Sequence, residues 1–329
     1  MISLATVRSG VPWTSLTIKT IYLQGLTNAA SQPLPAGPMT DDVAPAMLDS
    51  HVHLWDLAVR EQAWIPAGSP IRRSFDVRDL RSTLAGTPVG GVILVQVIND
   101  ADETADFIAC AKNADIVRGV VGWADLTSPD FAAALSALTA TGFLLGIRHQ
   151  ALAEADPADW LRSPRVGRSL TILDAAGLPF DLMIRPAHFQ AAREAARDHP
   201  SLQFVLDHLG KPSIAAGELE PWASGLRALA AESNIACKLS GLQTLASPDW
   251  TYGELAPYID IALEAFGPSR LIFGSDWPVS SQAAPYSRVC EVALAACSAL
   301  SGQERAAVIA GNARAIYLKQ TTYDKNDRH

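Results

Sequence analysis

The sequence predicts a single (β/α)8 barrel, and three features lead to this prediction. The chain has 329 residues, 49% of them hydrophobic and 18% charged, which suits one large α/β domain. From residue 47 onward, apolar runs of strand length alternate with segments whose apolar residues recur every three or four positions. Eight runs alternate in this way, and eight strands with helical crossovers close a parallel barrel.

The predicted strands are short, and several are apolar at every position. This pattern is typical of strands buried on both faces of a parallel sheet, and residues 91–98 show it most clearly. The predicted strands span residues 47–55, 91–98, 117–124, 145–150, 180–185, 203–208, 235–241 and 270–276.

Helical patterns occupy the connections between these runs. One of them ends ahead of Gly177 and Pro179, which commonly terminate helices. A doubly wound sheet often carries a glycine-rich turn after its first strand, but residues 49–53 contain no glycine, which favours the barrel. The predicted helices span residues 77–84, 101–114, 131–140, 165–176, 189–198, 220–232, 252–266, 286–300 and 302–318.

Residues 1–46 precede the barrel domain, which we expect to span residues 47–329. Residues 27–46 are rich in Ala, Pro, Ser and Gly, which indicates a flexible extension. Met39 and Met47 stand just ahead of the first strand, which favours a start assigned too early. The segment lacks the apolar core of a signal peptide, and no run reaches the ~18 apolar residues of a membrane span.

Charge and cysteine content narrow the expected partners and compartment. The net charge is −8 and no basic stripe is visible, which argues against nucleic acid and leaves a small-molecule substrate. The four cysteines form no metal-binding or redox motif, so we expect reduced residues of a cytoplasmic protein.

Polar side chains gather at the C-terminal ends of the predicted strands, where barrel enzymes have their active sites. His51 and His53 are two positions apart on an extended chain and therefore point the same way. His208 ends the sixth strand and Asp276 ends the eighth. Imidazoles and a carboxylate can hold a zinc-like ion, and an aspartate there can take a proton from water. We therefore predict these four residues as the catalytic group and, with a metal bound, its ligands.

A second set of residues at the same strand ends is predicted to bind the substrate. Arg148 and His149 end the fourth strand, Arg185 ends the fifth, and Lys211 follows the sixth. Their positive charge would favour an acidic substrate or a developing oxyanion. For Arg148, a salt bridge at the barrel rim is an equal alternative. Trp277 is assigned to the pocket wall, with packing in the core as the alternative.

A lysine and two histidines outside these sets also need an interpretation. Lys238 on the seventh strand requires a carboxylate if it is buried, and Asp207 or Asp276 could serve. His199 is interpreted as structural, whereas His188 lies just past the fifth strand, where a site histidine could sit.

Six segments carry a family resemblance: DSHVHLWD (residues 49–56), VVGWADL (120–126), GIRH (146–149), LDHLGKP (206–212), KLSGL (238–242) and FGSDWP (273–278). In this order and spacing they resemble the amidohydrolase superfamily. In particular they resemble its sugar-lactonase branch of L-fuconolactone and L-rhamnonolactone hydrolases, which is related to a pyrone-dicarboxylate lactonase. The similarity covers residues 47–318.

This resemblance implies hydrolysis of a lactone ring, an ester cleavage. It places His51, His53, His208 and Asp276 at catalytic or metal positions, and Arg148 with His149 at a substrate-binding pair. The branch is similar to metal-containing and metal-independent members alike. The resemblance therefore implies either one divalent metal ion, most readily zinc, or catalysis without a metal. The superfamily's two-metal sites often carry a carboxylated lysine where this chain has Arg148, which argues against a binuclear centre.

Two alternatives to the lactonase remain at this point. A non-oxidative decarboxylase of the same superfamily shares the paired histidines, the later histidine and the aspartate of the eighth strand, but residues 207–212 favour the lactonase. A catalytically silent barrel that binds a ligand or a partner protein is the other alternative, and the presence of every expected polar residue speaks against it.

Overall fold

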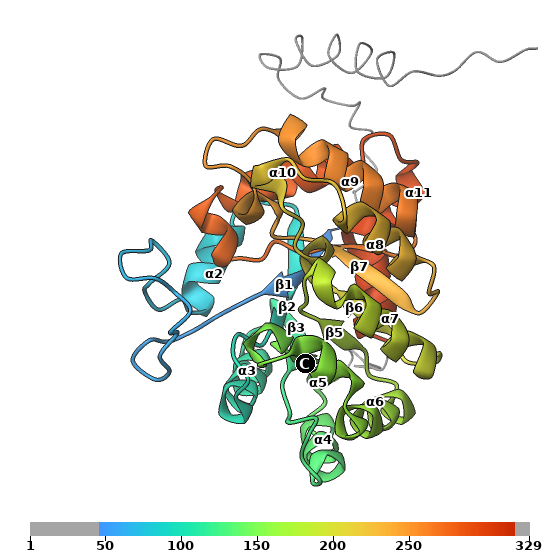
Figure 1. The fold of residues 1–329 in the computed structure, drawn as a ribbon. Helices are drawn as coiled ribbons and strands as arrows, with labels where there is room; N and C mark the ends of the chain where they lie inside the picture. The colour runs from blue at the N-terminus through green and yellow to red at the C-terminus, as the bar shows by residue number, and fades with distance from the viewer. Residues whose placement is uncertain (1–45, 320–329) are drawn as a thin grey trace, which may run out of the picture. The chain divides into compact units, whose positions relative to one another are not determined.

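The structure is a computed structural model that describes residues 46–319, and its centre is a parallel sheet of eight strands in chain order from β1 to β8. Residues next to β1 and β8 also meet, through a parallel bridge between Val52 and Trp277. The His53 amide donates to the Trp277 carbonyl at 2.7 Å, and the Asp276 amide donates to the His51 carbonyl at 2.9 Å. These contacts close the sheet into the predicted (β/α)8 barrel (Figure 1).

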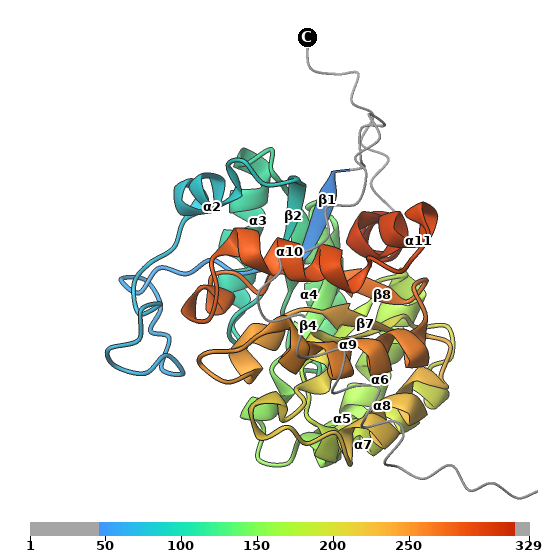
Figure 2. The same ribbon diagram turned by 90° about the horizontal axis from the view of Figure 1, so that it is seen from above.

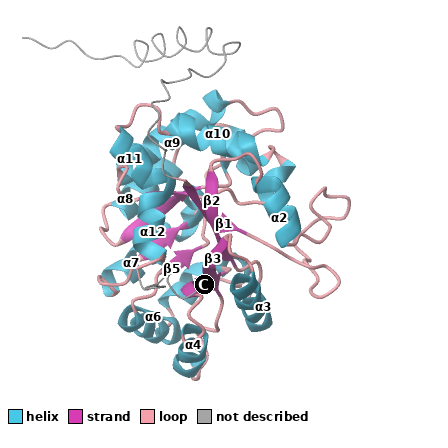
Figure 3. Cartoon of the chain, turned by 180° about the vertical axis from the view of Figure 1, so that it is seen from behind, coloured by secondary structure: helices cyan, strands magenta, loops and turns pink. Residues whose placement is uncertain are grey.

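The helices form a layer around the strands (Figure 2 and Figure 3). The strands are β1 (Met47–Val52), β2 (Val89–Val95), β3 (Val117–Gly122), β4 (Leu144–His149), β5 (Phe180–Leu182), β6 (Phe204–Leu206), β7 (Ile235–Leu239) and β8 (Leu271–Phe273). The helices are α2 (Val77–Leu84), α3 (Ala101–Asn113), α4 (Phe131–Thr139), α5 (Pro157–Arg162), α6 (Pro164–Ala176), α7 (Phe189–Asp198), α8 (Trp222–Ala230), α9 (Tyr252–Phe266), α10 (Tyr286–Ala296), α11 (Gly302–Ala306) and α12 (Asn312–Tyr317).

Several predicted strands were too long at their C-terminal ends. The sixth ends at Leu206 rather than at residue 208, and the eighth at Phe273 rather than at residue 276. The reason is the backbone, because His208 and Asp276 have φ angles of 53° and 60°. This left-handed conformation is incompatible with a strand. The predicted polar ends of these strands are therefore tight turns that aim their side chains at the barrel axis.

Two helical predictions also needed correction. Helix α5 was not predicted, because its six residues are too few to show a helical period. The last predicted helix, residues 302–318, consists of α11, a π-helical turn at Ala307–Gly311 and α12. Gly177 ends α6 in the left-handed conformation, as predicted.

The proposed extension, residues 1–46, lies outside the described residues except for Ala46. All four cysteines are unpaired. Among the described helices, none combines the length and the apolar character that crossing a bilayer requires.

Candidate active site

His51 and His53 lie side by side at the end of β1, with their ring centres 4.8 Å apart. His51 lies on β1 and His53 directly follows it, and their Nε2 atoms are 3.2 Å apart. His53 Nδ1 donates to the Val95 carbonyl oxygen at 2.7 Å. His51 Nδ1 lies 3.4 Å from Asp207 Oδ1 and 3.2 Å from Lys238 Nζ. Since His53 carries its proton on Nδ1, the lone pair of its Nε2 is directed toward His51 Nε2.

Asp276 completes this arrangement from the turn after β8. Its Oδ1 lies 3.4 Å from His53 Nε2 and 3.8 Å from His51 Nε2. Burial acts to raise the pKa of Asp276, but the neighbouring His208, His53 and His51 outweigh it and hold this pKa below its ordinary value. Asp276 is therefore an ionised carboxylate at neutral pH, 5% exposed at the mouth of the barrel.

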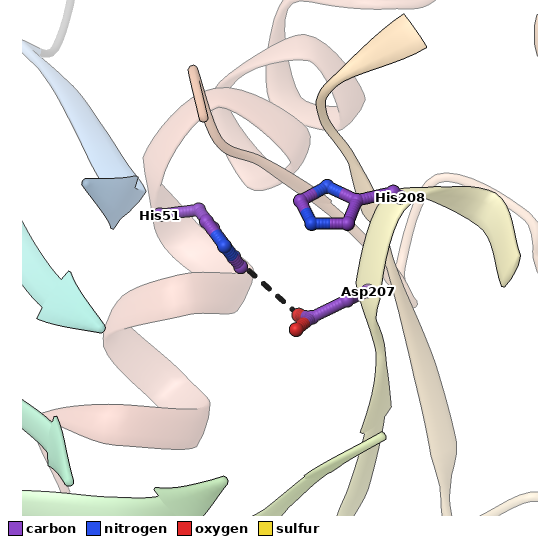
Figure 4. Close-up of side chains that lie close together, drawn as sticks. All are labelled: His51, Asp207 and His208. Carbon is purple, nitrogen blue, oxygen red and sulfur yellow. Dashed lines mark ion pairs between the residues drawn. The ribbon is translucent and has the colours of Figure 1, made fainter. Parts of the chain in front are cut away.

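His208 approaches from the turn after β6. Its Nδ1 lies 2.9 Å from Ser240 Oγ, and its ring centre is 4.6 Å from that of His51. Burial lowers the pKa of His208 to about 4, and burial likewise lowers that of His51 well below its usual value. Both imidazoles are therefore uncharged at neutral pH. Figure 4 shows His208 and Asp207 directed from one side toward His51 on the other.

We name His51, His53, His208 and Asp276 the mouth cluster. Two sets of potential ligand atoms lie within 4.8 Å of one another: His51 with Asp207 and His208, and His51 with His53 and Asp276. The first set already holds Lys238 Nζ, 3.2 Å from both His51 Nδ1 and Asp207 Oδ1. The second set has two imidazole nitrogens beside a carboxylate, which is a donor set that fits a zinc-like cation.

A second buried group of charges lies behind the mouth cluster, and we name it the inner network: Arg148, Asp181, Asp207, Lys238 and Tyr317. Lys238 Nζ lies 2.5 Å from Asp181 Oδ2, and Arg148 Nη1 donates to Asp207 Oδ2 at 3.0 Å. The Tyr317 hydroxyl lies 2.8 Å from Asp181 Oδ1. Each cation therefore has a carboxylate and each carboxylate has a donor.

The inner network contains the carboxylate partners that a buried Lys238 requires. Asp207 is one of its two carboxylate partners, as expected, but the other is Asp181 rather than Asp276. Asp181 and Tyr317 were not identified from the sequence. The signal for Asp181 was present, because it is the one charged residue within a fully buried strand, Phe180–Leu182. Tyr317 gave no comparable signal on its helix.

The residues predicted to bind substrate occupy different places. Arg148 is 1% exposed and contacts His51 Nε2 at 3.3 Å, so it lies inside the barrel rather than at the rim. Trp277 is buried, with its ring 5.4 Å from that of Phe75, as the packing alternative expects. Arg185 is exposed and Lys211 is partly buried. Burial lowers the pKa of Lys211, while the Asp276 carboxylate opposes this shift and Arg185 adds to it.

Comparison with known proteins places this geometry in a family. Residues 48–319 match the amidohydrolase family. The chain belongs to the amidohydrolase family. This confirms the family predicted from the sequence motifs.

The amidohydrolase has similar relatives of stated activity and known structure. It is 36% identical to an L-fucono-1,5-lactonase from Burkholderia ambifaria over 82% of this chain and 94% of the relative. It is 35% identical to an L-fucono-1,5-lactonase from Burkholderia multivorans, over 82% and 95%. A crystal structure of an amidohydrolase from Burkholderia multivorans with bound zinc superposes with a TM-score of 0.76. That protein is 33% identical, over 83% of this chain and 99% of the other.

Proposed function

We propose that this amidohydrolase opens the ring of a sugar-acid lactone by hydrolysis. The observation that carries the proposal is an ionised Asp276 whose carboxylate lies 3.8 Å from His51 Nε2 and 3.4 Å from His53 Nε2 at the barrel mouth. The similarity to two L-fucono-1,5-lactonases over most of both chains supports the lactone as the substrate class.

In the proposed reaction, Asp276 acts first as a base and then as an acid. Its carboxylate takes a proton from water as the water oxygen bonds to the lactone carbonyl carbon. When the tetrahedral intermediate collapses, the bond from this carbon to the ring oxygen breaks. Asp276 then returns its proton to that oxygen, which becomes a hydroxyl group. One water is consumed and one hydroxy acid is formed.

His51, His53 and Asp276 are the residues that would hold a divalent ion, zinc first, with His208 adjacent. Such an ion would supply Lewis-acid polarisation of the lactone carbonyl. In either case the protein fixes the imidazoles through their Nδ1 atoms, which contact Val95 and Asp207. Contacts of this kind orient histidines at metal sites.

Lys211 and Arg185 are the cationic side chains that we assign to the substrate. Lys211 follows the turn that carries His208, and the Asp276 carboxylate acts to raise its pKa, whereas Arg148 is committed to Asp207 within the barrel. Positive charge from Lys211 and Arg185 would stabilise the developing oxyanion or attract the hydroxyl groups of a polar ring.

The test is turnover of a panel of aldonolactones that includes L-fucono-1,5-lactone, by the wild type and by Asp276→Asn, each with and without a chelator. We expect Asp276→Asn to lower kcat by about a thousandfold, within the range for loss of a general base. Asparagine tolerates the left-handed backbone at this position, so the fold should persist.

Undiminished turnover by Asp276→Asn would overturn the assigned role. Carbon dioxide release from an aromatic acid would indicate a decarboxylase instead, and tight lactone binding without turnover would indicate a silent barrel. Loss of activity with the chelator, restored by zinc, separates the metal-assisted reaction from the metal-free one.

A further inference from the structure

His149 is the last residue of β4 and touches side chains from three consecutive loops. The loop after β2 supplies Asn99, whose Nδ2 lies 3.2 Å from His149 Nε2. The residue after β3 is Trp123, whose Nε1 donates to His149 Nδ1 at 3.0 Å. The segment after β4 supplies Glu154, with Oε1 2.8 Å from His149 Nε2.

These contacts determine which ring nitrogen of His149 carries the proton. The indole N–H of Trp123 can only donate, so His149 Nδ1 must accept and is unprotonated. The proton of the neutral ring is then on Nε2, where it is donated to Glu154, so the Asn99 amino group is a neighbour of Nε2 and not its hydrogen-bond partner. Burial lowers the pKa of His149, although Glu154 opposes the shift, which agrees with a neutral ring. Both nitrogens are thus occupied by protein groups.

The ring faces of His149 are engaged as well. The Trp160 indole of α5 stacks on the imidazole with a centre-to-centre distance of 4.0 Å and an angle of 14°. His149 is 4% exposed and Trp160 is 8% exposed. The Gln150 amide donates to Asn99 Oδ1 at 2.9 Å, which joins the loops after β2 and β4. Little of His149 is therefore available to a ligand.

We propose that His149 is a positioning residue that fastens the loops after β3 and β4 into one wall of the substrate pocket, with the loop after β2 joined through the adjacent Gln150. Loops at the C-terminal ends of the strands form the pocket of a barrel enzyme, so this wall faces the substrate. The role replaces the direct substrate contact expected of His149, and it rests on the proposed lactone hydrolysis. His149 does not touch the reacting groups of the mouth cluster, so it acts on binding.

The test compares His149→Phe, Trp123→Phe and the double variant with the wild type. His149→Phe keeps a ring to stack on Trp160 but loses both hydrogen bonds, and Trp123→Phe loses only the indole donor. We expect each to raise KM for the lactone about tenfold, the effect of ~1.4 kcal/mol, with kcat within about threefold of the wild type. The double variant should be no worse than His149→Phe, because the two residues act through one contact.

Gln203→Leu is the matched control. Gln203 is partly buried, and its Nε2 donates to the Asn234 carbonyl at 3.0 Å, which joins the segments ahead of β6 and β7 at the opposite end of the barrel. This variant also loses a side-chain donor to its neighbours, so its KM should remain that of the wild type. An equal rise in KM for Gln203→Leu would show a general effect of loosening the fold and overturn the proposal.

Nitrogen-15 NMR of the histidine rings gives a readout that does not depend on activity. We expect His149 in the wild type to show a protonated Nε2 and a hydrogen-bonded, unprotonated Nδ1. Trp123→Phe should shift the Nδ1 signal, and saturating lactone should leave both nitrogens unchanged. A protonated Nδ1, or a shift on lactone binding, would overturn the positioning role. Absent lactonase activity in the wild type would instead refute the proposed function, and the Trp123→Phe shift would still test the contact.

Discussion

The mouth cluster and the inner network are adjacent groups of buried polar side chains, but they differ in how their charges and protons are satisfied. In the inner network, Lys238 meets two carboxylates and Arg148 meets Asp207. In the mouth cluster, two imidazole Nε2 atoms and a carboxylate oxygen lie close together, and the nearby cation, Arg148 Nη1 at 3.3 Å from His51 Nε2, is already paired with Asp207.

This difference assigns stability to the inner network and catalysis to the mouth cluster. A buried ion pair with complete partners is costly to break, because the remaining charge is left without compensation. Converging acceptors are unfavourable on their own and become favourable when a proton or a cation is shared among them. We therefore expect substitutions in the inner network to affect folding first, and substitutions around the mouth cluster to affect turnover first.

The largest expected effect is the loss of stability caused by Lys238→Met in the inner network. This substitution removes the charge and keeps the length of the side chain. It leaves Asp181 and Asp207 short of a donor, and we expect the free energy of unfolding to fall by about 3 kcal/mol or more. Denaturant unfolding measures it. The double variant Lys238→Met with Asp181→Asn should recover part of the loss. Unchanged unfolding of the single variant would contradict the role of the inner network.

Gly241→Ala should have a smaller effect in free energy, and this effect should fall mainly on turnover rather than on folding. A Cβ at this position would lie 2.8 Å from Asp276 Oδ2 and 2.9 Å from His208 Nδ1. Displacing these groups should lower kcat about a hundredfold, because misplacement of about 1 Å can cost that much.

Gly217→Ala is the control for backbone strain. Gly217 has φ +68° and ψ 17°, close to the +65° and 11° of Gly241, but a Cβ there meets nothing within 4 Å. Both variants should lose similar stability, and only Gly241→Ala should lose activity. Equal kcat values for the two would show that the mouth cluster tolerates displacement.

The smallest effect concerns Glu103, a buried carboxylate outside both groups. It accepts from the Val97 and Ile98 amides, and burial raises its pKa from 4.5 to about 7. The folded state therefore holds a proton that the unfolded state releases, so stability falls as pH rises from 4.5 toward 7. Between about pH 6 and pH 7 the loss should be about 1 kcal/mol.

Glu103→Gln should remove this pH dependence, because the amide oxygen can still accept from both backbone groups. Unfolding curves of the two proteins at several pH values measure it. A slope of stability against pH that is the same in both would contradict the raised pKa.

The sequence was sufficient for the fold because the strands are continuously apolar and the helices separate them at regular intervals. The sequence also pointed to the residues of the mouth cluster, because each lies at or just after the C-terminal end of a strand, and their catalytic role stays a prediction. The partners of Lys238 were only half predictable. Asp207 stands beside a motif histidine, but Asp181 and Tyr317 meet Lys238 only through closure of the barrel, which no local pattern encodes.

The exact ends of the strands were missed for a related reason. His208 and Asp276 adopt left-handed backbone conformations, which their residue types permit but do not predict. The role of His149 was also hidden, since its neighbours Asn99, Trp123 and Glu154 come from three separate loops.

Tyr317 has a consequence for how the chain is made. It lies at the end of α12, yet its hydroxyl reaches Asp181 in the middle of the barrel. The Tyr317 hydroxyl therefore becomes available to the inner network only after all eight strands have been synthesised. The first strand must likewise wait for Trp277 before the barrel can close. The interior of this domain is completed at the end of translation rather than strand by strand as the chain emerges.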